Sequence, residues 1–185
     1  MDILTTVTLN PYEISTADFL GRSIRAYSQG RGHDPHDYHG RGMVENHIQA
    51  AGAELAYCKI FNIYPNFTIN ELRTDEDCIH DGRRVDVKWN PGHGNRTWLA
   101  VRASMRWKEP PEVFALMVGK SPTYNLIGWM MFDDLWQDEM LSTNRQIPLP
   151  EPAYIAYWYE LITDCANIQI PPMVQAGIQP NLPGL

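Results

Sequence analysis

Residues 83 to 90, RRVDVKWN, carry a pattern of side chains that could perform chemistry on one face of a strand. Charged and polar residues alternate with valine and tryptophan, which is the period of two that a strand requires. Asp86 and Lys88 therefore point to the same side, roughly 6 to 7 Å apart at about 3.3 Å of rise per residue. Such a pair is either part of a site or a surface ion pair, which would stabilise the protein by at most about 1 kcal/mol.

The Asp81-Gly82 pair before this strand predicts a hairpin turn, because both central residues of a type I′ turn need positive φ. Antiparallel pairing around the turn would place Asp77 opposite Asp86, with Cβ atoms about 4.5 to 5.5 Å apart. Two carboxylates at that distance repel each other unless a cation neutralises them. By the same count Asp75 falls opposite the lysine, so we expect up to three carboxylates beside one ammonium group.

These carboxylates predict a divalent cation site. Oxygen ligands at this density suit magnesium or manganese better than zinc, which prefers histidine and cysteine. A helix predicted over residues 43–61 would add Glu54, which points along its apolar stripe and needs a partner there. If that helix packs on the hairpin, Glu54 can act as a further ligand or as a base for water. The alternatives are an acidic cluster on a solvated hairpin and a glutamate that reaches solvent from the edge of the stripe.

The helix, the hairpin and the next strand follow one another in a known order. A helix with an inward Glu in AAGAELAYCKIFNIY, then D-x8-D-V-K in DCIHDGRRVDVK, then the strand TWLAV resembles the core of the PD-(D/E)xK nuclease superfamily. More narrowly, the order DVK, LAV, FALMVG and LIGWM resembles small uncharacterised proteins that are often encoded by phages. The resemblance covers roughly residues 42 to 160.

The resemblance implies an α/β (α+β) fold with a three-layer restriction-endonuclease-like core, in which helices flank a central mixed β-sheet. It also implies a site that hydrolyses phosphodiester bonds with Mg2+ or Mn2+. Asp77, Asp86 and Glu54 would be the metal ligands, and Lys88 would sit next to the attacking water.

The sequence departs from the superfamily pattern at the first aspartate. That residue usually follows a proline or another small residue, whereas Glu76 precedes Asp77 here. Asp75 and Asp81 are nearby alternatives, so the identity of the first metal ligand stays open.

We expect a metal-dependent DNA endonuclease, restriction-like or junction-resolvase-like, that acts on duplex or branched DNA as a homodimer. The rival is a nuclease-fold protein that no longer cuts and binds a protein or DNA partner. A net charge of -7 favours the rival, because proteins that grip phosphates usually carry an excess of basic residues. Four arginines near the site in sequence are candidates for phosphate contacts, with a solvated rim as the alternative: Arg83, Arg84, Arg96 and Arg102.

The other elements are read from periodicity and turn residues. Apolar residues at helical spacing predict a helix over residues 14–28, with Ser15 and Asp18 as its capping box. Further strands are expected in TWLAVRAS, VFALMVG and YNLIGWMMF, and a helix in DDLWQDEML. The chain of 185 residues then divides into an N-terminal helix and His/Gly-rich loop (1–41), the nuclease-like core (42–160) and a Pro-rich tail (161–185) that could hold a protein partner.

The remaining features bear on location and on a second metal. His33, His36 and His39 could bind zinc, although their three-residue steps are not a standard zinc spacing and a polar loop is the alternative. No apolar run approaches the roughly 18 residues of a membrane span, and the N-terminus lacks a secretory pattern. The three cysteines form no C-x-x-C pair, so we expect reduced thiols in a cytoplasmic protein, inside a bacterial host if a phage encodes it.

Overall fold

The computed structural model describes residues 3–30, 43–69, 76–92, 97–105, 107, 109–145, 147, 149 and 151–163. The strands are β1 (Thr5–Thr8), β2 (Cys78–His80), β3 (Arg83–Asn90), β4 (Trp98–Arg102), β5 (Val113–Lys120), β6 (Thr123–Met131) and β7 (Ala153–Tyr157). The helices are α1 (Pro11–Gly30), α2 (Met43–Phe61) and α3 (Phe132–Leu135), with short 3-10 turns at Asp138–Met140 and Trp158–Glu160. Several predictions lie outside the described residues: those on His33, His36, His39, Asp75, Arg96, Cys165 and 164–185.

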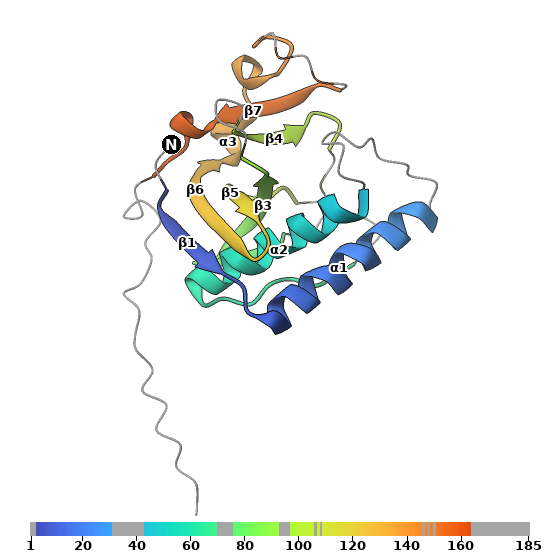
Figure 1. The fold of residues 1–185 in the computed structure, drawn as a ribbon. Helices are drawn as coiled ribbons and strands as arrows, with labels where there is room; N and C mark the ends of the chain where they lie inside the picture. The colour runs from blue at the N-terminus through green and yellow to red at the C-terminus, as the bar shows by residue number, and fades with distance from the viewer. Residues whose placement is uncertain are drawn as a thin grey trace, which may run out of the picture.

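The chain folds into three layers around a mixed sheet (Figure 1). Five strands lie in the order β1-β6-β5-β3-β2, and only β3 and β5 run parallel. α2 packs on one face of this sheet and α1 packs against α2, while a β4-β7 pair and α3 cover the other face. The predicted mixed α/β three-layer arrangement is confirmed, with a small second sheet in place of long helices in one outer layer.

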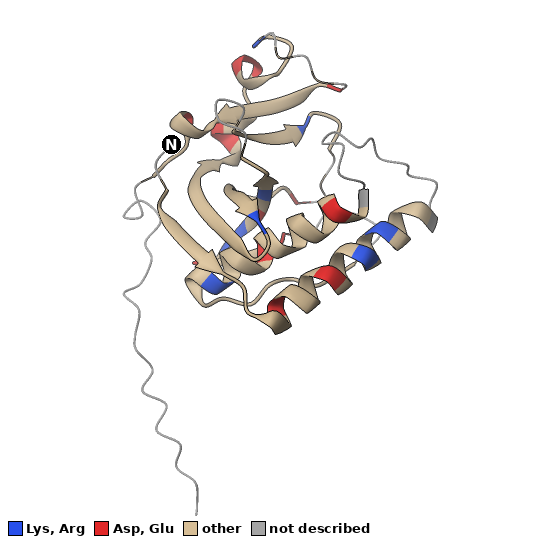
Figure 2. Cartoon of the chain, in the orientation of Figure 1, with Lys and Arg blue, Asp and Glu red and all other residues tan. Residues whose placement is uncertain are grey.

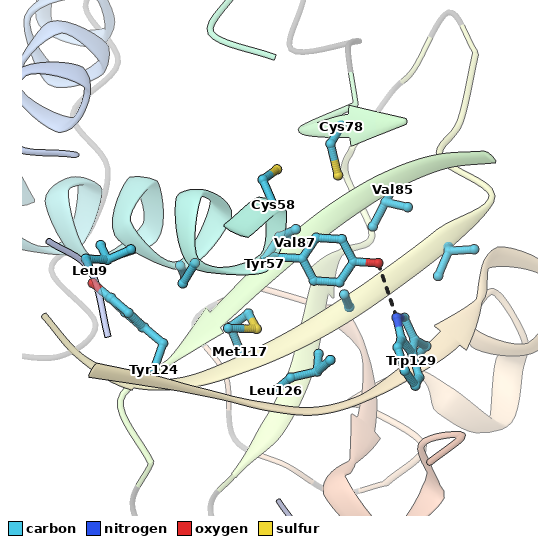
Figure 3. Packing of buried hydrophobic residues seen from close by; sticks show 14 residues of the cluster. Leu9, Tyr57, Cys58, Cys78, Val85, Val87, Met117, Tyr124, Leu126 and Trp129 are labelled. Atoms are coloured by element: carbon cyan, nitrogen blue, oxygen red, sulfur yellow. Dashed lines mark hydrogen bonds between the residues drawn. The ribbon is translucent and has the colours of Figure 1, made fainter. Parts of the chain in front are cut away.

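The core beneath α2 is built by alternate residues of the strands. Val85 and Val87 of β3 point toward α2, and β5 and β6 add apolar residues to the same cluster. Figure 3 shows the Tyr57 ring between α2 and the sheet, where its hydroxyl accepts a hydrogen bond from Trp129 Nε1 at 3.3 Å. The bond gives the buried indole N–H of Trp129 an acceptor.

The second core lies between the sheet and the β4-β7 layer. β5 is buried on both faces, as expected for a central strand, so its even-numbered residues Phe114 and Leu116 face this layer. Leu99 of β4 and Ala156 of β7 are fully buried against them.

Several predicted elements are confirmed and several are wrong. The helix over 43–61 and the Asp81-Gly82 turn are confirmed, with φ of 50° and 78° at the two turn residues. The strand expected in TWLAVRAS, β4, does not join the main sheet, because it pairs with β7. Neither β7 nor β1 was predicted from the sequence. The helix expected in DDLWQDEML is limited to one turn, Phe132–Leu135, followed by a 3-10 turn.

Charged side chains are distributed unevenly over these elements (Figure 2). Lys, Arg, Asp and Glu mark α1, α2 and β3, whereas β6 and β7 carry none. None of the helices within the described ranges combines the length and hydropathy that crossing a bilayer requires.

The start of α1 corrects the predicted capping box. Asn10 Oδ1 accepts hydrogen bonds from the amides of Tyr12 and Glu13 at 2.9 and 3.0 Å, and Glu13 Oε2 accepts one from the Asn10 amide at 2.6 Å. Ser15 lies inside the helix, where its hydroxyl donates to the Pro11 carbonyl. The helix starts earlier than predicted because Pro11 suits the first helical position after an asparagine cap.

Asn10→Ala is therefore expected to lower the free energy of unfolding by about 1 kcal/mol, because two helix amides lose their acceptor. Urea denaturation followed by circular dichroism measures the change. Ser15→Ala is the matched control and should leave the midpoint almost unchanged. Equal losses in the two variants would show that Asn10 does not act as the cap.

Candidate active site at the edge of β3

The site begins where β2 stops and β3 continues. The ladder pairs Cys78 with Val85, Ile79 with Arg84 and His80 with Arg83, as the hairpin turn predicts. In the described part of the chain, no strand pairs with β3 on this side beyond that ladder. The ladder with β2 therefore covers only the first three residues of β3, Arg83 to Val85.

Asp77 lies at this edge of β3, just beyond the end of the ladder. Its Oδ2 accepts a hydrogen bond from the Val87 amide at 2.6 Å, and its own amide donates to the Val85 carbonyl at 2.9 Å. The prediction that Asp77 lies directly opposite Asp86 in the ladder is thus wrong. The chain leaves the regular register at this point because a side-chain carboxylate takes the place of a backbone acceptor.

Asp86 and Lys88 lie on the face of β3 turned away from α2. Their register partners on β5 are Phe114 and Leu116, which belong to the second core. Lys88 Nζ donates to both carboxylate oxygens of Asp86, at 2.6 and 2.7 Å. The side chains are 27% and 14% exposed, so the pair is not the solvated surface ion pair that the sequence left as an alternative.

Glu54 reaches the same cluster from α2. Burial and the negative charge of Asp86 raise the pKa of Glu54 to about 7, and the charge of Lys88 opposes this shift. Burial and the carboxylates of Glu54 and Asp86 also raise the pKa of Asp77 well above its usual value. The structure therefore brings together the four residues predicted from the sequence as catalytic.

The ammonium group is held charged by its surroundings. Burial alone would lower the pKa of Lys88, but the carboxylates of Asp86, Asp77 and Glu54 outweigh burial and raise the pKa. Three acids share this one internal cation. Two of the acids consequently stay protonated more readily than an exposed carboxyl group would.

The donor atoms of the site bear on whether it can hold a divalent cation. Within the described residues, no three His, Cys, Asp or Glu side chains converge closely enough to hold a metal ion. Both oxygens of Asp86 are bonded to Lys88. What fits a cation is the chemistry of the set, namely hard carboxylate oxygens. Burial, and after it the charges of the neighbouring carboxylates, raises the pKa of Glu54 and of Asp77. Of the alternative ligands, Asp81 is exposed at the turn, at the other end of β2.

Three of the four arginines predicted to contact phosphates lie in the described residues, and each of the three has a partner inside the protein. Arg84 Nη1 lies 2.7 Å from Glu109, and its Nε donates to the Pro110 carbonyl. Arg102 forms an ion pair with Glu151 at 2.8 Å. Arg83 Nη1 lies 3.8 Å from the sulfur of Met131. A phosphate would have to exchange with these partners.

A buried hydrogen bond that the sequence reading missed joins α2 to the hairpin. His80 Nδ1 lies 2.8 Å from the Tyr57 hydroxyl, and both side chains are buried. Burial lowers the pKa of His80, opposed by the charge of Asp81. Tyr57 follows Glu54 by three residues and His80 follows Asp77 by three, so this bond fixes the two acids relative to each other. The signal was the alternation of β2, which turns Cys78 and His80 inward.

The raised pKa of Glu54 predicts an unusual pH dependence of stability. The folded chain keeps a proton that the unfolded chain releases above about pH 4.5, so this contribution is complete below that pH and is lost as the pH rises through 7. We expect the free energy of unfolding without added metal to be higher at pH 5.5 than at pH 7.5 by about 2 kcal/mol from this group. Urea denaturation at both pH values measures the difference.

Glu54→Gln should remove most of this difference. Glu13→Gln is the control, because its carboxyl group, with a lowered pKa, lies on α1 and its loss leaves the contribution of Glu54 in place. An equal difference in the free energy of unfolding between pH 5.5 and pH 7.5 in the native chain and in Glu54→Gln would contradict the placement of Glu54 beside Asp86.

Comparisons with known proteins add no relative. No protein-family model matches the chain, and neither a curated protein nor a solved structure matches it. The case for a function therefore depends on the residues of the site and their geometry.

Proposed function

We propose that the chain is a metal-dependent nuclease that hydrolyses phosphodiester bonds of DNA at the edge of β3 where Asp77 lies. The observation that supports this proposal most directly is the partly buried Asp86–Lys88 pair, whose charges act on Glu54 and Asp77, two acids with raised pKa values. Perturbed acids gathered around a charged lysine are typical of sites that perform chemistry.

Mg2+ or Mn2+ would be held by Asp77, Asp86 and Glu54. Such an ion supplies two things when bound: a more acidic water and a positive charge beside the phosphate. Binding requires Asp86 to release at least one oxygen from Lys88, because both oxygens accept hydrogen bonds from it.

The protein side chains have separate roles in the proposed reaction. Lys88 stays charged and can stabilise the negative charge that develops on the phosphate oxygens. Glu54 is either a ligand of the ion or the base: when it does not ligate the ion, its pKa of about 7 is matched to accepting a proton from the attacking water near neutral pH. The Asp77 bond to the Val87 amide holds the edge strand in place beneath both groups.

The first prediction from this proposal concerns nicking of supercoiled and branched DNA in Mg2+ or Mn2+. Asp86→Asn and Lys88→Ala should each lower the rate by about 100-fold or more. The two variants should differ in their affinity for Mg2+, which calorimetry measures. Asp86→Asn loses a ligand and should bind Mg2+ poorly, whereas Lys88→Ala frees both Asp86 oxygens and should bind Mg2+ at least as well as the native chain.

Asp18→Asn is the matched control, since it makes the same charge change in an exposed ion pair with Arg22 on α1. It should cut like the native chain. Native cutting by Asp86→Asn or Lys88→Ala at equal folded fraction would rule out this site.

A second prediction concerns stability in the presence of the cation. Bound Mg2+ should raise the melting temperature more at pH 8 than at pH 5.5, because below neutral pH the ion must displace protons from Glu54 and Asp77. At a Mg2+ concentration of about 100 times the Kd, the gain in the free energy of unfolding should approach 2.7 kcal/mol. Differential scanning calorimetry measures it, and Asp86→Asn should abolish it. A gain that is equal at both pH values would place the ion elsewhere.

A binding protein that keeps this arrangement without cutting is the second candidate. The pairing of Lys88 with both oxygens of Asp86 favours it, because the lysine already neutralises that carboxylate. The same experiments separate the two functions. Absence of cutting on every substrate, together with no Mg2+ binding in calorimetry, would support the binding protein.

A nuclease that cuts both strands of a duplex would need two such sites, which the homodimer expected from the sequence would supply.

A further inference from the structure

An exposed aromatic side chain lies on the same face as the acid cluster. Tyr64 follows α2 and is 92% exposed, the highest value among the large apolar side chains that are exposed in the described residues. No hydrogen bond or ring contact holds its side chain within that part of the chain. Packing therefore does not account for its position.

The strand register places Tyr64 relative to the site. Pro65 forms an antiparallel bridge with Cys78, and the Asn66 amide donates to the Asp77 carbonyl at 2.6 Å. Opposed residues share a face, and Cys78 is buried toward α2. Tyr64 comes directly before Pro65 and Ile79 directly after Cys78, so both side chains point away from α2. Tyr64 therefore lies beside Ile79, which is 47% exposed.

The face of the sheet that carries Tyr64 and Ile79 continues onto β3. Ile79 pairs with Arg84, and Asp86 lies two residues further along the same face. Two strand spacings of about 4.8 Å and two residues of about 3.3 Å put Tyr64 roughly 12 Å from Asp86. That is about three to four nucleotides of one DNA strand at about 3.4 Å each.

Electrostatics limit how a nucleic acid can gain affinity at this surface. The chain has a net charge of -7, and the guanidinium of Arg84 is already paired with Glu109 at 2.7 Å. Broad phosphate contacts are therefore weak here. Stacking of bases on aromatic rings needs no charge and tolerates any sequence.

We propose that Tyr64, with Ile79 beside it, is a stacking platform for an unpaired base of the substrate. This inference rests on the proposed nuclease function and specifies its substrate class. A base inside an intact duplex has no free face to offer, whereas single-stranded DNA and the unpaired nucleotides of a branch do. The site thus acts on DNA with unpaired bases within a few nucleotides of the scissile bond.

The test measures binding in EDTA, where no cation supports cutting. A labelled single-stranded oligonucleotide that carries 2-aminopurine reports affinity by anisotropy and stacking by fluorescence quenching, and the same sequence as a duplex is compared. The native chain should bind the single strand more tightly. Tyr64→Ala should weaken single-strand binding by about five-fold or more and remove the quenching, because stacked aromatics typically contribute at least that much.

Two further variants separate stacking from other effects. Tyr64→Phe keeps the ring and should bind like the native chain. Tyr12→Ala removes a tyrosine that is 86% exposed on α1, and it too should bind like the native chain. Unchanged single-strand binding in Tyr64→Ala, tighter binding of the duplex, or no binding of either oligonucleotide would overturn the inference. So would a native dimer that becomes monomeric in Tyr64→Ala, since the patch would then be an interface between copies.

The binding test is independent of the cutting test. Loss of binding in Tyr64→Ala with no cutting by the native chain would keep the platform and reject the nuclease. Cutting that depends on Asp86 with no effect of Tyr64 would do the reverse.

Discussion

The ladder between β2 and β3 ends at the Cys78–Val85 pair, and the place of Asp77 in the site depends on this end. The Val87 amide lies beyond the ladder and needs an acceptor. Asp77 supplies one through its side chain, which draws a carboxylate to the edge of the sheet. Glu54 comes from α2, which packs on one face of the sheet. The alternation of β3 sets Lys88 beside Asp86.

The resulting cluster balances burial against charge. Each carboxylate removed from water loses hydration, and its neighbours add repulsion. One ammonium group offsets part of both costs, since Lys88 donates to Asp86 and lies near the other two acids. The remaining imbalance appears as raised pKa values at Glu54 and Asp77. Elsewhere the chain places its acids differently: Asp18 and Glu13 have basic partners of their own and lowered pKa values.

Local sequence rules predicted the parts of the fold that local physics determines. The bounds of α2 and the turn at Asp81 and Gly82 followed from periodicity and from the need for positive φ. The partners of β4 did not follow, because strand pairing across more than 50 residues leaves no local trace. The site residues were found because Asp86 and Lys88 are two apart on a strand. The departure of Asp77 from the register could not be found, since it depends on a side chain competing with backbone for one amide. The inward turn of His80 was available in the alternation of β2 and was overlooked.

The hydrogen bond between Tyr57 and His80 has a consequence for how the molecule folds. The hairpin that contains Asp77, Asp86 and Lys88 is local in sequence, and two charges of opposite sign meet in it early. Glu54 joins these residues only when α2 docks on the hairpin. The Tyr57–His80 bond formed by docking connects residues that are 23 apart in the sequence. Repulsion between Glu54 and the hairpin acids Asp77 and Asp86 is therefore absent from the separate pieces and arises at the docking step. In the terms of energy landscapes, the site is a region of local frustration inside an otherwise consistent fold, and the buried Tyr57–His80 contact is among those that oppose it.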